Sequence, residues 1–200
     1  MKEVNKLKVL HFTKQLGFKI PGSQIFSSPK DLECIESSDR RYITKAISEM
    51  QPVFVDDTLY LNYTRDILME EILEKEQRII PTLLQEKIHK EYEIRVFFFD
   101  EKIWAIVTFD LSGNTDVRNM KTSDKKYIPY KLPSFVNEKI IALKNELGLN
   151  CGTIDFLKTK NDYYFLEINP VGQFGMVSKP CNYYLEEQMS LYILKNHEKK

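Results

Sequence analysis

The sequence predicts an α+β protein with mainly antiparallel sheets, organised as one domain or two small lobes. Strand-length apolar runs come in pairs separated by short polar turns, a spacing typical of β-hairpins. The predicted turns are Asp56-Asp57, Asp100-Glu101 and Asn161-Asp162. Other segments carry apolar residues at helical spacing, and a glycine follows two of them as a C-terminal cap. With 42% hydrophobic content, a chain of 200 residues can bury a sizeable core.

The first part of the chain is expected to alternate between helices and strands. Its opening helix has Leu7, Leu10 and Leu16 at helical spacing and ends at Gly17. We expect, in order, a helix, an extended segment, a short helix, a strand, a hairpin and an amphipathic helix, at residues 5–18, 23–27, 29–36, 41–47, 53–63 and 66–77.

The second part is expected to be richer in strands. A buried strand at 81–88 runs into a polar hinge and is followed by a hairpin at 93–109. The polar stretch 111–130 predicts a long loop or a mobile hairpin. A helix, two strands and a final helix complete the expected order, at residues 133–147, 152–157, 163–169 and 182–196.

The overall charge selects no class of polymeric partner. The chain carries 29 basic and 29 acidic residues, so no global field favours nucleic acid or an acidic membrane. The longest apolar runs have the length of strands, which is far short of a membrane span. The three cysteines are odd in number and lack Cys-x-x-Cys spacing, so neither a disulfide framework nor a zinc site is expected. We therefore expect a cytoplasmic protein whose recognition depends on local charges.

Three oxygen-bearing side chains lie on the last two predicted strands. Glu167 and Asn169 share one face of a strand because successive side chains alternate, and Leu166 and Ile168 are expected to point into the core. Asp155 lies in the preceding apolar run, which a hairpin would place beside them. Two carboxylates and an amide oxygen suit magnesium. The alternative is a sheet edge whose polar residues face water.

Basic and hinge residues earlier in the chain suggest a phosphate-bearing ligand. Lys45 at a strand end could place its ammonium against phosphate oxygens, although most such lysines are simply solvated. The run Gln85-Glu86-Lys87-Ile88 leaves a buried strand and could offer backbone groups to the edge of an adenine ring. The alternative is an ordinary polar strand end.

Two acid–base pairs are further candidates. Glu93 and Arg95 alternate on one face of an apolar strand, where they could contact ribose hydroxyls and phosphates or form a cross-strand ion pair. Asp116 and Arg118 lie in the polar stretch, where an arginine can bind a carboxylate or an acyl phosphate with two nitrogens. Most exposed loop arginines have no such role.

Taken in order, these residues resemble the ATP-grasp superfamily of carboxylate ligases. The matching order is a strand lysine, a Gln-Glu-x-Ile hinge, Glu-x-Arg, a basic substrate segment, Asp, and then Glu-x-Asn. Further segments resemble the microviridin-type or graspetide branch and, within it, the grasp-with-spasm peptide maturases. These segments are Asp116-x-Arg118-Asn119, Tyr127-x-Pro129-Tyr130-x-Leu132-Pro133, Phe165 to Phe174 and Pro180-Cys181-Asn182-Tyr183. The likeness covers nearly all of the chain.

The resemblance implies an ATP-grasp fold, with two α+β lobes at 1–85 and 86–200 enclosing a nucleotide site. It implies ATP and Mg²⁺ as cofactors. Magnesium would be held by Asp155, Glu167 and Asn169. The nucleotide would contact Lys45, Gln85, Glu86, Lys87, Ile88, Glu93 and Arg95. The core peptide would be handled by the catalytic pair Asp116 and Arg118, with Arg118 stabilising an acyl phosphate.

The reaction implied by the resemblance is ATP-dependent formation of ester or amide macrocycles within a ribosomally made precursor peptide. The partner would be the leader and core of that peptide, with no nucleic acid and no membrane, and a homodimer is compatible. Two departures stand out: the N-terminal lobe usual in the family is missing, and 46–58 lacks glycine. The alternatives are a carboxylate–amine ligase for small substrates, similar to glutathione synthetase, and a truncated, non-catalytic nucleotide- or peptide-binding fragment.

Overall fold

The computed structural model describes residues 4–32, 41–45, 47, 53–60, 64–67, 81–110, 125–170 and 173–197. These residues fall into two compact units. The first unit comprises the described residues up to 20 and from 90 onward, and the second those between 21 and 89. Among the described helices, none is long and apolar enough to cross a bilayer.

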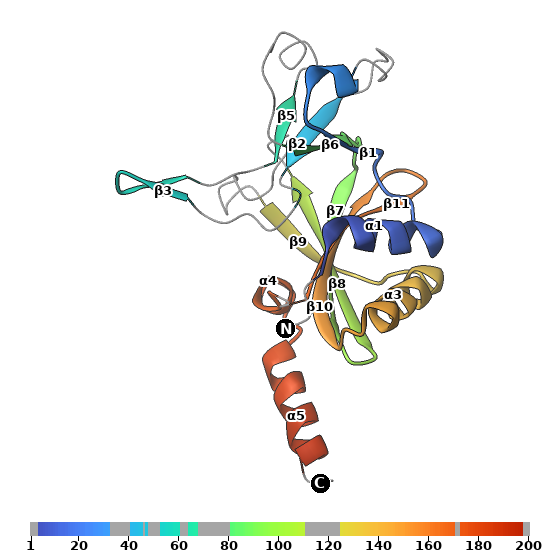
Figure 1. The fold of residues 1–200 in the computed structure, drawn as a ribbon. Helices are drawn as coiled ribbons and strands as arrows, with labels where there is room; N and C mark the ends of the chain where they lie inside the picture. The colour runs from blue at the N-terminus through green and yellow to red at the C-terminus, as the bar shows by residue number, and fades with distance from the viewer. Residues whose placement is uncertain are drawn as a thin grey trace. The chain divides into compact units, whose positions relative to one another are not determined.

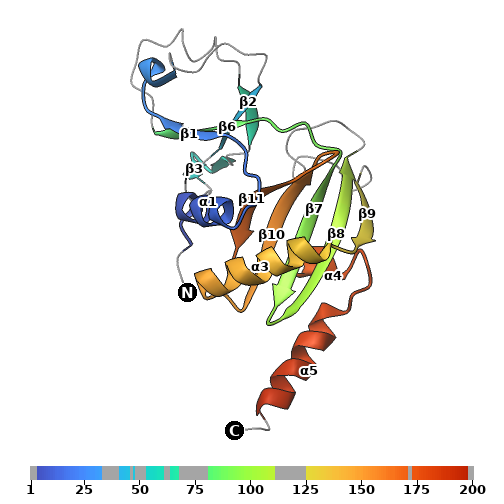
Figure 2. The ribbon, with the colours of Figure 1, turned by 90° about the vertical axis from the view of Figure 1, so that its right-hand side faces the viewer.

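An antiparallel sheet in the order β11-β10-β7-β8-β9 forms the centre of the first unit (Figure 1). Its strands are β7 (Tyr92–Phe99), β8 (Lys102–Asp110), β9 (Lys125–Tyr130), β10 (Cys151–Lys158) and β11 (Tyr163–Asn169). Its helices are α1 (Lys6–Gln15), α3 (Ser134–Leu147), α4 (Gly175–Ser178) and α5 (Leu185–His197). Figure 2 shows α3 crossing one face of the sheet and α4 on the other.

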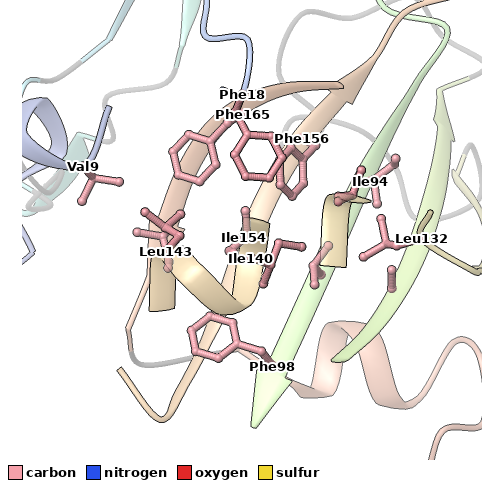
Figure 3. Close-up of a cluster of buried hydrophobic side chains, with 14 of the residues drawn as sticks. Val9, Phe18, Ile94, Phe98, Leu132, Ile140, Leu143, Ile154, Phe156 and Phe165 are labelled. Atoms are coloured by element: carbon pink, nitrogen blue, oxygen red, sulfur yellow. The ribbon is translucent and has the colours of Figure 1, made fainter. Parts of the chain in front are cut away.

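Each face of this sheet has its own hydrophobic cluster because strand residues alternate between faces. Under α1 and α3, the buried residues include Ile94, Phe98 and Ile140. Figure 3 shows the rings of Phe18, Phe156 and Phe165 within this cluster, and the centroids of the last two lie 5.7 Å apart. The opposite face packs against α4 and α5 through the buried residues Phe97, Ile106, Val177 and Leu185.

The second unit contains a sheet in the order β1-β6-β2-β5 and a separate β3-β4 hairpin. The elements are β1 (Ser23–Phe26), the 3₁₀ helix η1 (Pro29–Leu32), β2 (Tyr42–Lys45), β3 (Val53–Val55), β4 (Thr58–Tyr60), β5 (Arg65–Ile67) and β6 (Thr82–Glu86). Asp56 and Asp57 turn the hairpin with φ angles of 46° and 60°. Positive φ at both central positions is the requirement of a type I′ turn.

The helix ends agree with the sequence predictions at α1 and α3. Asn5 caps α1 by accepting a hydrogen bond from the Lys8 N–H at 3.0 Å. Gly17 and Gly148 follow the two helices with φ angles of 77° and 60°, a conformation in which glycine has no Cβ penalty. The predicted hairpins β7-β8 and β10-β11 are also confirmed.

Three sequence predictions are wrong in part. The helix predicted from 66 meets strand β5, which forms the edge of a sheet by pairing with β2, and 68–77 lies outside the described residues. For the stretch 111–130, predicted as a long loop or a mobile hairpin, the loop alternative is wrong at 125–130, which form strand β9 and pair with the edge of β8. The last helix begins at Leu185, whose N–H donates to the Ser178 hydroxyl at 3.0 Å. For β5 and β9, pairing with another strand decides the local structure, and the start of α5 depends on Ser178, seven residues earlier in the chain.

We predict that Gly152→Ala lowers the free energy of unfolding by about 1–3 kcal/mol, the usual range for overpacking. A Cβ at this position would lie 2.7 Å from Cζ of Phe98 and 2.8 Å from the Asn169 carbonyl oxygen. Urea unfolding measures the effect. Gly175→Ala is the matched control, since its Cβ would meet no atom within 4 Å and should leave stability unchanged or slightly raised. Equal stability of both variants would contradict the prediction.

Candidate functional site

Asp155 and Glu167 lie directly opposite each other on β10 and β11. Asn169 follows two residues after Glu167 and shares its face of the sheet. The register shifts between Asp155 and Phe156, so Leu166 is the extra residue of a β-bulge. Leu166 is therefore half-buried, and Phe165 and Ile168 point into the core instead. The expectation that Leu166 points inward was wrong because the bulge changes the alternation.

A row of charged side chains continues from these strands onto β7. Arg95 is the register partner of Asp155, and its NH1 atom lies 3.8 Å from Oδ1 of Asp155. On the other side, Nδ2 of Asn169 lies 3.5 Å from Oε1 of Glu167. Like charges directly opposite each other in a sheet are destabilising. The two carboxylates therefore require a nearby positive charge.

Lys6 supplies a second cation to this row. Its Nζ lies 3.5 Å from Oε2 of Glu167, and both side chains are partly exposed. Helix α1 reaches this position because the Phe165 N–H donates to the Lys19 carbonyl oxygen at 2.9 Å. No local sequence signal separates Lys6 from other helix lysines, so the sequence analysis missed it. Only the packing of α1 beside β11 reveals it.

The donor set of this row suits a hard divalent cation. Asp155 and Glu167 offer carboxylate oxygens, and Asn169 contributes an amide. The cation contacts of 3.5 and 3.8 Å are longer than the usual 2.7–2.9 Å of charge-assisted hydrogen bonds. Among the described residues, no group of three or more His, Cys, Asp or Glu side chains is arranged so that it could hold a metal ion. The fit to magnesium rests on the oxygen donors of Asp155, Glu167 and Asn169, because magnesium takes few protein ligands and keeps several waters.

Arg95 faces several groups. One of its amino nitrogens lies 3.5 Å from Oε1 of Gln173, and its buried Nε has no hydrogen-bond partner among the described residues. Burial raises the pKa of Tyr127, while the Arg95 charge acts to lower it. Glu93 forms its ion pair with Lys90 and not with Arg95. Arg95 therefore acts as the counter-ion of Asp155 and not of Glu93.

The second unit contains the other described candidates. Lys45 ends β2 opposite Leu83. Gln85 is fully buried and donates to the Ser23 hydroxyl at 2.8 Å, which leaves its Oε1 unpartnered among the described residues. Lys87 pairs with Asp66 at 2.7 Å. Lys45 thus lies on the antiparallel sheet of the second unit, and Lys87 lies in the connection that leaves this sheet.

Backbone hydrogen bonds hold the predicted hinge. The Glu86 N–H donates to the Gly22 carbonyl and the Lys87 N–H to the Arg41 carbonyl, each at 2.8 Å. Ile88 is half-buried. The expected catalytic pair Asp116 and Arg118 lies outside the described residues.

Comparison with solved structures identifies the class of fold. The macrocyclase MdnC from Microcystis aeruginosa, bound with precursor peptide MdnA, is 27% identical, with a TM-score of 0.78. The alignment covers 96% of this chain and 61% of MdnC. A Chryseobacterium gregarium ATP-grasp ligase in complex with ADP and a leader and core peptide is 21% identical, with a TM-score of 0.68, over 84% of this chain and 52% of that one.

A more distant similarity in fold is found with one further ligase. The D-alanine–D-alanine ligase of Bacillus anthracis is 16% identical, with a TM-score of 0.55, over 83% of this chain and 56% of that one. No protein-family model and no curated protein sequence matches the chain.

The chain has the ATP-grasp fold. Within that fold, the chain is similar to the macrocyclase MdnC, which is bound with a precursor peptide, and to the ATP-grasp ligase in complex with a leader and core peptide. The chain spans between half and two thirds of the length of these solved structures. The fold expected from the sequence is confirmed.

We predict that Glu167→Gln weakens Mn²⁺ binding at least tenfold, because even residues that only support metal ligands typically contribute tenfold or more. Mn²⁺ replaces Mg²⁺ as a paramagnetic probe, and electron paramagnetic resonance measures the free ion. Asp162→Asn is the control on the same hairpin, since Asp162 pairs with the exposed Lys19. Unchanged affinity in Glu167→Gln would exclude this carboxylate as a ligand.

Proposed function

We propose that the chain acts in an ATP-dependent ligase that forms ester or amide macrocycles between side chains of a ribosomally made precursor peptide. The observation that most directly supports this function is the row formed by Arg95, Asp155 and Glu167, with Asn169 beside it, on a sheet of the ATP-grasp fold. The similarity to MdnC over 96% of the chain supports the choice of a peptide as substrate.

The reaction proceeds in two balanced steps. A side-chain carboxylate of the peptide attacks the γ-phosphorus of ATP, which forms an acyl phosphate and releases ADP. A hydroxyl or amine of the same peptide then attacks the acyl carbon and loses its proton, and phosphate leaves. Formation of each ring therefore removes one water molecule from the peptide and consumes one ATP. The protein has to position the groups and neutralise charge, so no covalent enzyme intermediate is needed.

The residues of the first unit would hold the metal and the phosphates. Asp155, Glu167 and Asn169 would hold magnesium, which supplies positive charge to phosphate oxygens when bound. Arg95 would neutralise charge on phosphate and keep Asp155 oriented. Lys6 would balance Glu167. Glu93, which pairs with Lys90, would contact ribose hydroxyls.

The residues of the second unit would contact the remainder of the nucleotide. Lys45 and Lys87 would bring ammonium groups to it, as point charges that suit phosphate. Gln85, Glu86 and Ile88 would form the hinge beside adenine. The sequence predicted lobes at 1–85 and 86–200, whereas the described residues up to 20 lie in the same compact unit as those from 90 onward. A homodimer and a cytoplasmic location belong to the same proposal.

Asp116 and Arg118 would handle the peptide. Arg118 would stabilise the acyl phosphate, because a guanidinium can donate two parallel hydrogen bonds to such a group. Asp116 would orient the attacking hydroxyl or amine or accept its proton.

Mass spectrometry tests the proposal with the chain, Mg²⁺-ATP and the short peptide encoded beside its gene. We expect loss of water from the peptide in whole multiples, matched by equal ADP formation. Arg118→Ala should reduce ring formation by about a hundredfold or more, as removal of a charge-stabilising donor usually does. Lys160→Ala is the control at an exposed turn position.

Two outcomes would point to other functions. ADP formation stimulated by free amino acids without any peptide would favour a small-substrate ligase, for which the D-alanine–D-alanine ligase provides the structural precedent. Nucleotide binding without ADP formation under either condition would favour a non-catalytic binding fragment.

A further inference from the structure

A hollow of about 370 Å³ opens at the edge of the first unit's sheet, where β9 ends. Figure 2 shows β9 stopping part of the way along β8. In the register, β9 pairs with β8 from Asp110 to Ala105, which leaves the start of β8 without a described neighbour on that side. The hollow is lined there by Ile103, Trp104, Tyr130, Lys131, Asn137 and Tyr183.

The backbone of Ile103 points into this open edge. In an antiparallel ladder, the residues that exchange hydrogen bonds alternate along the strand. Pro129 pairs with Ile106 and has no N–H to donate, so Ile106 does not exchange hydrogen bonds with β9. The residues of β8 that do so are Ala105 and every second residue from it. Ile103 is two residues from Ala105 and presents its N–H and C=O in the same direction. An extended chain could pair with these groups.

Polar side chains around the edge favour a particular ligand. The Oδ1 atom of Asn137 is buried and has no hydrogen-bond partner among the described residues, so rotation of this lining side chain would present a free acceptor to an incoming N–H. Lys131 is exposed, and no acidic side chain from the described part of the chain lines the hollow. The hydroxyl of Tyr183 donates to the Ala105 carbonyl at 2.7 Å and closes the edge beside the last β9 pair. The lining therefore suits a peptide with acidic side chains.

The rings of Trp104, Tyr130 and Tyr183 give the hollow apolar walls. Trp104 stacks on Phe97 at 5.9 Å, so its position is fixed by the core. Residues 129–132 and Tyr183 meet at this hollow, and its lining includes none of the metal or nucleotide candidates.

We propose that the open edge of β8 binds an extended, acidic segment of the peptide substrate as an added strand. Main-chain hydrogen bonds to Ile103 would supply affinity, and Lys131 would select carboxylates. Asn137 would receive a peptide N–H. The assignment of this segment to the enzyme's own substrate rests on the proposed function, whereas binding of an acidic peptide can be measured without it.

Trp104 is the sole tryptophan of the sequence, so its fluorescence reports on this hollow. The probe is a short synthetic peptide of alternating Thr and Glu, titrated into the full chain without nucleotide. We expect a saturable change in Trp104 emission. The change should be absent with a peptide whose backbone is N-methylated at alternate residues and weaker with the Gln counterpart of the peptide.

Two variants test the polar contacts. Lys131→Glu should weaken binding about fivefold or more, because it replaces an attraction by a repulsion at the rim. Asn137→Leu should weaken binding about fivefold, since it removes one hydrogen-bond acceptor but no partnered group of the fold. Lys160→Glu makes the same charge change at an exposed turn position and should bind as the parent does. Circular dichroism of each variant checks that the fold is retained.

Three results would overturn the proposal. The first is the absence of a saturable change in Trp104 emission when the peptide is added to the folded chain. The second is equal binding by Lys131→Glu and the parent. The third is a change in emission with protein concentration alone, which would mean that a second copy occupies the edge. Failure of macrocycle formation, in contrast, would count against the proposed function and leave this binding result standing.

Discussion

The pairing of β10 with both β7 and β11 is the constraint on which the rest of the first unit depends. It sets Arg95, Asp155 and Glu167 in one row across three strands. Their side chains share a face because register partners point to the same side of a sheet. A shift of one residue in either pairing would turn the ligand candidates toward the hydrophobic core. The register therefore decides whether this surface can hold a cation at all.

Close packing beneath β10 maintains that register. Phe98 is the partner of Gly152 on β7 and lies where a side chain on Gly152 would have to be. The Asn169 carbonyl approaches the same position from β11. A glycine is therefore required by space and not by backbone angle. The β-bulge at Leu166 changes which side chains of β11 point inward on its two sides. Phe165 before the bulge and Ile168 after it both pack into the cluster under α1 and α3.

Charge balance connects the first helix to the site. Two carboxylates on adjacent strands would repel each other, and Arg95 and Lys6 offset that repulsion from opposite sides. Lys6 lies about 160 residues before its partner in the chain, so it contributes through tertiary packing and not through any local motif. Hydrogen-bonding groups at the edge of β8 are in a similar situation. Ile103 lies beyond the last residue that pairs with β9, and Oδ1 of Asn137 has no hydrogen-bond partner among the described residues.

The sequence by itself determined the hairpins, the capped helices and the identity of the oxygen-bearing side chains. Those features depend on neighbours within a few residues, such as the turn at Asp56-Asp57 and the cap at Asn5. Only the tertiary structure decided that Glu93 pairs with Lys90, that Lys6 faces Glu167, that Leu166 is bulged and that 125–130 forms a strand. Each of these depends on strand register or on contacts between distant segments, and the free energy of such contacts has no local signature in a single sequence.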